Sequence, residues 1–255
     1  MVRKIDLSNF LIVVLAAGYG KRMGIIGKKY PKCLLKIGSS TLLKIIINIL
    51  KRIKFNKIFF ILGYKSNLII NSINNENIKF NYLINGKFKQ YGHAYSWYLS
   101  QKQWNKEKKK TLILHADIFF DEKYIINILK SKIKNIIGSK TIINNSKKNI
   151  YRILVSKKNK ILKISKSALI KFASHEVIGI NKLSILMQKK LYKFMSKEFK
   201  NKKKLLMSWE DMLNNFIKST NANFYILKNQ NYKWINVNTI KDYAKVKKIF
   251  RNKII

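Results

Sequence analysis

The most constraining feature of this sequence is a glycine-containing segment that follows a short apolar run. The apolar run covers residues 10–15, and the chain continues as Leu15-Ala16-Ala17-Gly18-Tyr19-Gly20-Lys21-Arg22-Met23. A buried strand that ends in small residues, two glycines and two cations is typical of a phosphate-binding loop. Glycines allow backbone N–H donors to approach an anion closely, and the cations neutralise its charge. We therefore expect an active-site loop for a ligand with several phosphates.

A second segment, Tyr30-Pro31-Lys32-Cys33-Leu34-Leu35, follows a few residues later. Together the two segments read L-A-A-G-x-G-x-R-M and P-K-x-L, a pattern that resembles the signature of nucleotidyltransferases. These enzymes join a nucleoside triphosphate to a phosphorylated small molecule and release pyrophosphate. The resemblance implies catalytic roles for Arg22, beside the β- and γ-phosphates, and for Lys32, between the α-phosphate and the acceptor phosphate. It also implies nucleotide binding by Leu15, Ala16, Ala17, Gly18, Gly20 and Lys21.

The strong positive charge bears on the class of partner. The chain has 54 Lys plus Arg against 11 Asp plus Glu, a formal net charge of +43. Arginine is preferred for specific phosphate and base recognition, yet nearly all of these cations are lysines, spread along the whole chain. A bias toward Lys, Ile and Asn is what adenine- and thymine-rich coding produces. We therefore expect most lysines to lie on a solvated surface and predict no specific nucleic-acid partner.

The sequence also bears on the cellular compartment. Cys33 is the only cysteine, which excludes an intramolecular disulfide and fits a reducing compartment. The basic residues Arg3 and Lys4, followed by the apolar residues 10–17, resemble a secretory signal. However, the same apolar residues are needed as the strand that leads into the glycine loop, so we predict a cytoplasmic protein. No apolar run approaches the ~18 residues of a membrane-spanning helix.

Strand-like and helix-like patterns alternate along the chain, which predicts a Rossmann-like three-layer α/β/α fold with a mostly parallel mixed sheet. We expect strands at 10–15, 57–62, 79–84 and 111–114, and helices at 41–51, 67–74, 122–130, 184–199 and 240–250. Short strands at 140–143, 151–155 and 161–165 predict a small antiparallel insertion on the acceptor side. We expect a single domain over 1–255: a nucleotide-binding part at about 8–130, an acceptor-side part at about 131–235, and a closing helix at about 239–251.

The segment His115-Ala116-Asp117 follows the expected central strand at 111–114. In open α/β sheets, ligands bind at the carboxyl ends of the strands. A carboxylate that faces a triphosphate there is suited to hold Mg²⁺, which prefers oxygen ligands. Asp117 also matches the acidic residue that the nucleotidyltransferases have at this strand end. We therefore predict Asp117 as a catalytic metal ligand, and Asp121 as the N-cap of the helix at 122–130.

The aromatic segment at 91–99 is expected to run from a loop into a helix at Ala94. In the nucleotidyltransferases that the chain resembles, this region covers the nucleotide base. The resemblance therefore implies base-side contacts for Gly92 and Ser96. The aromatic side chains are also compatible with ordinary core packing, and His93 is as compatible with a hydrogen bond at the helix start as with ligand binding.

Three later segments resemble cytidylyltransferases that activate phosphocholine or 2-aminoethylphosphonate. They match the family patterns E-x-I-G-I-x-K-x-S at 176–184, Y-E-D at 209–211 and W-x-E-I-D at 234–238. The resemblance favours CTP as the nucleotide and an ammonium-bearing acceptor, because carboxylates and aromatic faces bind such groups. The implied acceptor contacts are Glu176, Trp209, Glu210, Asp211 and Trp234. Core packing of the tryptophans and a helix-dipole role for the two acids at 210 and 211 stay open.

The last of these segments departs from the family pattern. Asn236 and Asn238 stand where the family has acidic residues, and Asn238 falls on the expected second metal carboxylate. An amide oxygen can coordinate Mg²⁺ but adds no negative charge. We therefore expect weaker metal binding or a loss of activity.

Other classes of protein also have a glycine-containing loop after a strand. A dinucleotide-binding oxidoreductase is disfavoured because Met23 replaces the third glycine of its motif and residues 38–46 lack the acidic residue that binds ribose. A glycosyltransferase should present two acids around the metal, and only Asp117 is found at this strand end. A sugar-1-phosphate nucleotidyltransferase and a non-catalytic nucleotide-binding homologue remain open, as does a homodimer.

Overall fold

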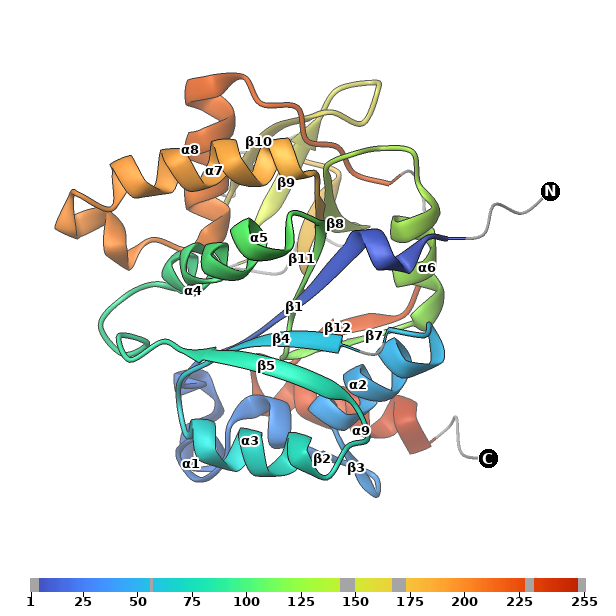
Figure 1. Cartoon of the computed structure of the whole chain (residues 1–255). Coiled ribbons are helices and arrows are strands. Elements are labelled where there is room, and N and C mark those ends of the chain that lie inside the picture. Colours follow the sequence, from blue (N-terminus) through green and yellow to red (C-terminus); the bar gives the residue numbers. More distant parts are fainter. Residues whose placement is uncertain (1–4, 56, 143–149, 167–172, 228–231, 252–255) are drawn as a thin grey trace.

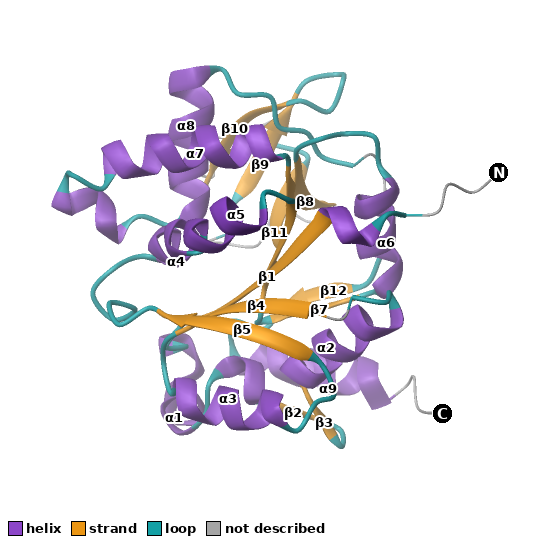
Figure 2. Cartoon of the chain, viewed as in Figure 1, coloured by secondary structure: helices purple, strands orange, loops and turns teal. Residues whose placement is uncertain are grey.

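The computed structural model describes residues 5–55, 57–142, 150–166, 173–227 and 232–251. A twisted sheet forms the middle of the molecule, and helices lie on both of its faces (Figures 1 and 2). In chain order, the strands of this sheet are β1 (Phe10–Ala16), β4 (Lys57–Leu62), β5 (Lys79–Ile84), β6 (Lys110–His115), β8 (Ile136–Thr141), β9 (Arg152–Val155), β10 (Ile161–Ser165) and β11 (His175–Leu183).

The order of strands across the sheet is β10-β9-β11-β6-β1-β4-β5, and β8 also pairs with β11. The four strands from β6 to β5 run parallel to one another. The pairings of β11 with β6, β8 and β9 are antiparallel, as is that of β9 with β10. The mixed α/β sheet predicted from the alternating pattern is therefore confirmed.

Strand β1 shows why the protein has three layers. Its side chains alternate between two hydrophobic clusters, with Leu11 and Val13 in one and Ile12 and Val14 in the other. Because both faces of the strand are buried, helices must cover both sides of the sheet. The first cluster includes residues of α4 (His93–Leu99), α5 (Gln101–Glu107), α7 (Ile185–Glu198) and α8 (Trp209–Thr220). The second includes residues of α2 (Leu42–Arg52), α3 (Ser66–Asn74), α6 (Glu122–Lys130) and α9 (Ile240–Arg251).

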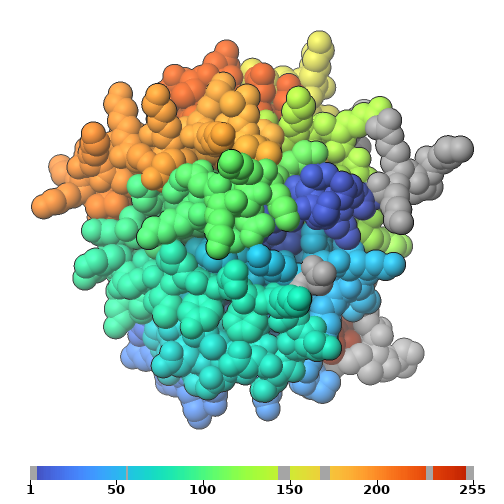
Figure 3. All heavy atoms as spheres, in the orientation of Figure 1, coloured from blue at the N-terminus to red at the C-terminus, as the bar shows by residue number. Residues whose placement is uncertain are grey.

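Several predicted elements have the expected bounds. Strands β4 and β5 and helix α6 match the predicted ranges 57–62, 79–84 and 122–130. Asp121 caps α6 as predicted, because its carboxylate accepts the Lys123 N–H at 3.0 Å. Figure 3 shows the segments from the middle of the chain (green) packed between the earlier segments (blue to cyan) and α7 and α8 (orange).

The predicted antiparallel insertion differs in part from the observed structure. Strand β8 begins at Ile136 rather than at residue 140, because Ile136 and Ile137 are buried in its pairing with β11. Residue 143, the predicted end of that strand, lies outside the described residues. The predicted antiparallel character is confirmed, because β9 pairs antiparallel with both β10 and β11 and so extends the main sheet.

A second, two-stranded sheet brings the C-terminal part of the chain to the main sheet. It pairs β7 (Ile118–Phe120) with β12 (Trp234–Asn236) in antiparallel register. The pairing continues past the strands, since the Val237 N–H donates to the Asp117 carbonyl at 2.8 Å. The sequence did not predict this pair, the hairpin of β2 (Lys36–Ile37) and β3 (Ser40–Thr41), or the short helix α1 (Gly24–Lys29).

No helix in the described ranges is long and apolar enough to cross a bilayer.

Candidate active site

The glycine loop and Asp117 lie at the same edge of the sheet because β1 and β6 are neighbouring parallel strands. Their register pairs Leu15 with His115, and the Ala116 N–H donates to the Leu15 carbonyl at 3.0 Å. The chain leaves β1 toward Gly18 and leaves β6 toward Asp117. Residues far apart in the sequence thus meet at the carboxyl ends of the parallel strands, where α/β proteins bind ligands.

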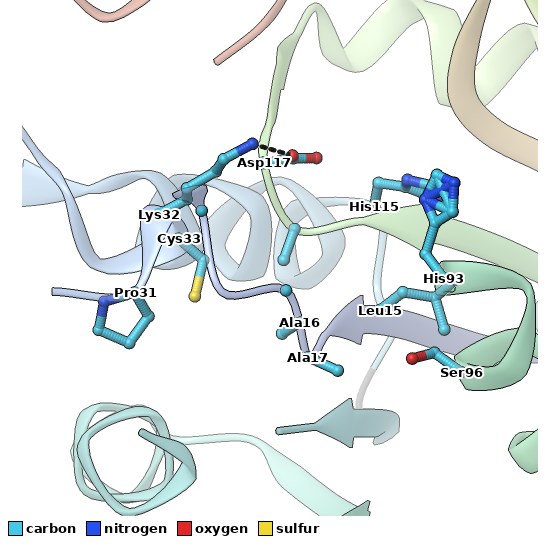
Figure 4. A pocket seen from close by; sticks show the side chains of 13 residues that line it. Leu15, Ala16, Ala17, Pro31, Lys32, Cys33, His93, Ser96, His115 and Asp117 are labelled. Carbon is cyan, nitrogen blue, oxygen red and sulfur yellow. Dashed lines mark hydrogen bonds and ion pairs between the residues drawn. The ribbon is translucent and has the colours of Figure 1, made fainter. Parts of the chain in front are cut away.

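Lys32 connects the polar groups at this edge. It begins a short 3-10 helix, Lys32–Leu34, and its Nζ lies 3.0 Å from Asp117 Oδ2 (Figure 4). The same Nζ donates to Asn238 Oδ1 at 2.9 Å, and that oxygen also accepts a hydrogen bond from Arg22 Nη2 at 2.8 Å. The structure therefore brings together the three predicted catalytic residues and Asn238.

The Lys32–Asp117 pair is shielded from solvent, with side-chain exposures of 13% and 30%. Burial alone acts to raise the pKa of the Asp117 carboxyl, but Lys32 and then His115 outweigh it, so this pKa is lower than usual. Asp117 is therefore a carboxylate at neutral pH. Neighbouring Cys33 is buried, and burial raises the pKa of its thiol to about 12, so it packs as a neutral side chain.

Asp117 and Asn238 form the candidate metal-binding pair. Within the described part of the chain, no group of three or more His, Cys, Asp or Glu residues could hold a metal ion. Mg²⁺ often takes only one or two protein oxygens and completes its shell with phosphates and water. Since Lys32 Nζ bonds both the Asp117 and the Asn238 oxygens, these oxygens face one small region. The donor set therefore fits a Mg²⁺ ion that takes most of its ligands from a triphosphate.

The glycine loop is held by specific contacts. Gly20 adopts a left-handed conformation, with φ of +68°, before the 3-10 helix Lys21–Met23. Tyr64 contacts both sides of the loop. Its N–H donates to the Ala17 carbonyl at the start of the loop at 3.1 Å, and its hydroxyl donates to the Lys28 carbonyl in α1 at 2.6 Å. A Cβ added at Gly20 would lie 3.1 Å from Lys32 Cγ, so this glycine also leaves room for the Lys32 side chain.

Replacing Gly20 with alanine should lower both stability and activity. The left-handed conformation costs an alanine about 1 kcal/mol, and the new methyl group presses on Lys32. We expect a lower melting temperature and a roughly tenfold lower kcat/KM, measured by thermal denaturation and by pyrophosphate release. Gly86→Ala is the control because a Cβ there meets no atom within 4 Å. Equal losses of kcat/KM in the two variants would contradict the contact with Lys32.

A cavity of about 120 Å³ lies between the glycine loop, Lys32 and α4. The predicted residues that line it are Leu15, Ala16, Ala17, Gly18, Gly20, Lys32, Ser96 and Asp117. Its wall also includes five residues that were not predicted to belong to the site: Pro31, Cys33, His93, His115 and Ala116. His115 could have been suspected from its position two residues before Asp117.

Three of the predicted catalytic and nucleotide-binding residues lie outside this lining. Lys21 and Arg22 are exposed beside the cavity. Gly92 donates its N–H to the Leu205 carbonyl at 2.7 Å, and a Cβ there would lie 2.1 Å from the Met207 carbonyl oxygen. Packing against this segment is therefore sufficient to require a glycine at position 92. A larger cavity, of about 800 Å³, lies at the opposite edge of the sheet near the start of β1, and none of the predicted site residues lines it.

The predicted acceptor residues lie on three elements, namely β11, α8 and β12. Trp209 is 1% exposed, and its ring packs against those of Trp97 and His115. Asp211 accepts hydrogen bonds from the hydroxyls of Tyr151 (2.5 Å) and Ser208 (2.7 Å) at the start of α8.

Glu210 contacts another wall residue of the cavity: its Oε2 lies 3.2 Å from Nε2 of His93. Glu176 is buried in β11. Trp234 lies in β12 opposite Phe120, with the Lys140 ammonium 5.6 Å from its ring centre.

Glu210 should make stability depend on pH. Burial, followed by the charge of Asp211, raises the pKa of its carboxyl to about 8. The folded protein therefore binds this proton more tightly than the unfolded chain does, so the Glu210 contribution to stability falls as pH rises from about 4.5 to 8. Glu210→Gln removes this titration. We expect the stability of the variant relative to the wild type to increase between pH 5 and pH 8.5, by up to about 4 kcal/mol.

The measurement is denaturant unfolding of both proteins at the two pH values. Glu122→Gln is the matched control because that carboxylate pairs with Arg52 on the outside of α6. The control should gain nothing at high pH. A Glu210→Gln effect of the same size at pH 5 and pH 8.5 would show that the carboxyl is not protonated in the folded state.

Comparison with known proteins agrees with this geometry. Residues 12–136 match the family model of the MobA-like NTP transferase domain. This part of the chain, just under half of its 255 residues, is similar to that family. The match begins within β1 at Ile12, includes the glycine loop, Lys32 and Asp117, and ends at the first residue of β8. Asn238 and the predicted acceptor residues lie beyond it.

Individual relatives extend the comparison to the rest of the chain. CTP:phosphoglutamine cytidylyltransferase of Campylobacter jejuni is 25% identical over 123 residues, which are 47% of this chain and 48% of that protein. The aligned part thus spans about half the length of this curated relative. The structure of CTP:phosphocholine cytidylyltransferase of Streptococcus pneumoniae is similar with a TM-score of 0.77 and 19% identity, over 94% of this chain and 99% of that one. The inositol-1-phosphate CTP transferase of T. maritima gives 0.78 and 20%, over 95% of each chain. These structural likenesses show the fold.

Proposed function

We propose that this protein is a nucleotidyltransferase, and more narrowly a cytidylyltransferase that transfers CMP from CTP to a small phosphorylated acceptor and releases pyrophosphate. The observation that carries the proposal is the contact of Lys32 with both Asp117 and Asn238 beside the glycine loop. A cation, a carboxylate and the backbone amides of a glycine loop at one sheet edge suit a triphosphate. The names of three similar proteins, each a CTP-dependent transferase, favour CTP.

The reaction needs little covalent help from the protein. An oxygen of the acceptor phosphate is already anionic near neutral pH and attacks the α-phosphorus in line. The new P–O bond forms as the bond from the α-phosphorus to the bridging oxygen breaks, and pyrophosphate leaves with that electron pair. Catalysis then depends on alignment and on charge neutralisation.

Each catalytic residue has a task in this scheme. Lys32 lies between the two reacting anions and reduces their repulsion. Arg22 and the amides of Gly18 and Gly20 stabilise the charge that develops on pyrophosphate. When bound by Asp117 and Asn238, Mg²⁺ would supply further positive charge to the phosphates. Asp117 also holds Lys32 in place through the 3.0 Å ion pair.

The acceptor is proposed to carry an ammonium group, as phosphocholine and 2-aminoethylphosphonate do. Glu210 supports this idea because its carboxyl lies beside His93 and burial raises its pKa, even though the charge of Lys166 acts in the opposite direction. An acceptor cation near His93 would favour the charged carboxylate. The acceptors named for similar proteins, which are phosphoglutamine, phosphocholine and inositol 1-phosphate, share only the phosphate group.

The test is a pyrophosphate-release assay of the purified protein. CTP, UTP, GTP and ATP are each combined with phosphocholine, 2-aminoethylphosphonate, phosphoglutamine, inositol 1-phosphate and several sugar 1-phosphates. We expect release with CTP and one phosphorylated acceptor. Release only with a sugar 1-phosphate would identify a sugar-1-phosphate nucleotidyltransferase and overturn the proposed acceptor class.

A second candidate is a nucleotide-binding homologue that lacks catalysis. Asn238 favours it, because this amide brings no charge to the metal pair and already accepts hydrogen bonds from Arg22 and Lys32. The same assay with increasing Mg²⁺ and Mn²⁺ distinguishes the two. Activity that appears at high metal concentration supports the enzyme, whereas CTP binding without turnover for any acceptor supports the homologue.

A further inference from the structure

A buried side-chain pair lies behind one end of the active-site cavity. Asn85 directly follows β5 and is 1% exposed, and Ser96 is 5% exposed in α4. Asn85 Nδ2 donates to Ser96 Oγ at 3.0 Å. Ser96 lines the cavity, whereas Asn85 does not. Asn85 is therefore in a position to act on a ligand only through Ser96.

The backbone fixes which way the Asn85 amide points. Its Oδ1 accepts the Lys87 N–H at 3.0 Å, which leaves Nδ2 to face Ser96. Because an amide nitrogen only donates, the Ser96 hydroxyl must accept on that side. Within the described part of the chain, Asn85 is the residue that forms a side-chain hydrogen bond with this hydroxyl. The Ser96 hydrogen is thus free to point into the cavity.

The location of Ser96 suggests what receives this hydrogen. In Figure 4, Ser96 and His93 lie at the end of the cavity away from the Lys32–Asp117 pair. If the triphosphate occupies the Lys32 end, as the proposed function requires, the nucleobase lies toward Ser96. Leu15 and Ala17 of the β1 end form the wall between the two ends.

We propose that Asn85 is a positioning residue that sets Ser96 as a hydrogen-bond donor to the nucleobase. The recognised group is an acceptor atom, which cytosine offers as its 2-carbonyl oxygen and as N3. This inference rests on the proposed nucleotide binding. It adds the residue that determines whether Ser96 donates or accepts the hydrogen bond to the base.

Asn85→Asp tests the proposal because it keeps the shape of the side chain and reverses its hydrogen bond. One carboxylate oxygen still accepts the Lys87 N–H, and the other accepts from Ser96, so the hydroxyl turns away from the cavity. We expect the Kd for CTP, measured by calorimetry, to rise roughly tenfold, the effect of one lost hydrogen bond in a buried site. The Kd for tripolyphosphate, which has no base, should stay unchanged. Ser96→Ala should give the same pattern.

A double-mutant cycle shows whether Asn85 acts through Ser96. In the Ser96→Ala background, Asn85→Asp should cost no further CTP affinity. Asn81→Asp is the matched control, because it adds the same charge at an exposed site on β5 and should change neither ligand's Kd. Asn85→Ala, which frees the hydroxyl without reversing it, should lose less affinity than Asn85→Asp and provides a second variant if the charged one unfolds.

The outcomes separate this inference from the proposed function. Wild-type protein that binds none of the four nucleoside triphosphates overturns the proposed function. Wild-type protein that binds CTP overturns only the role of Asn85 in any of three cases: an unchanged Kd in Asn85→Asp, equal losses for CTP and tripolyphosphate, or additive losses in the double variant.

Discussion

Replacing Lys32 with alanine is expected to lower kcat by two to three orders of magnitude. The ammonium contacts both Asp117 and Asn238, and removing one such group from a charge-stabilising site typically costs 10²–10³-fold in turnover. The binding of CTP should weaken less than kcat falls, since Arg22 and the loop amides remain. Pyrophosphate release gives kcat, and calorimetry gives the Kd for CTP.

Lys36→Ala is the matched control for this prediction. Lys36 lies four residues along the chain with an exposed side chain, so its loss removes the same charge outside the site. The Lys32 variant leaves the Asp117 carboxylate without its cation and should melt at a lower temperature. The assay is therefore run well below that temperature. Near-normal kcat in a folded Lys32→Ala protein would rule out its role between the two anions.

Replacing Asp117 with asparagine should lower kcat at least 100-fold. The amide keeps the shape of the side chain but removes the only carboxylate of the proposed metal pair. Both ligands would then be neutral amides, so the Mg²⁺ concentration for half-maximal activity should also rise. Direct titration with Mn²⁺, followed by its paramagnetic resonance signal, tests metal binding separately from catalysis.

Asp121→Asn is a suitable control for the Asp117 variant. Asp121 accepts the Lys123 N–H as the N-cap of α6, and asparagine caps helices about as well as aspartate. This variant should keep both activity and metal affinity. If Asp117→Asn keeps its kcat and its metal affinity, the charge at position 117 is not needed and the proposed metal pair is wrong.

The parts of the fold that the sequence predicted are those with local signals. Strand β4 is an apolar run that ends at a glycine, and α6 begins with Asp121 as its cap. Strand β11 was not recognised because it contains buried polar residues, Glu176, Asn181 and Lys182, which interrupt an apolar pattern. The pairing of β7 with β12 joins three-residue strands more than 100 positions apart, and no local pattern specifies such a contact.

The same distinction between local and long-range signals applies to the residues of the candidate site. Arg22, Lys32 and Asp117 were predicted by motifs that follow strands, and the parallel register of β1 and β6 brings them together. The acceptor side was predicted from three segments that resemble cytidylyltransferases, with core packing left open for the tryptophans, and Trp209 is buried against Trp97 and His115. The sequence held an unused signal for Asp211: Ser208 precedes it by three residues, the spacing of a capping box.

The pairing of β7 with β12 also affects the order in which the site can form. Lys32 and Asp117 are synthesised well before Asn238, which reaches Lys32 only through its position just after β12. A nascent chain on the ribosome can thus fold its first βα units long before the third polar group arrives. The candidate site can consequently be completed only after residues 234–238 have emerged from the exit tunnel, about 120 residues after Asp117.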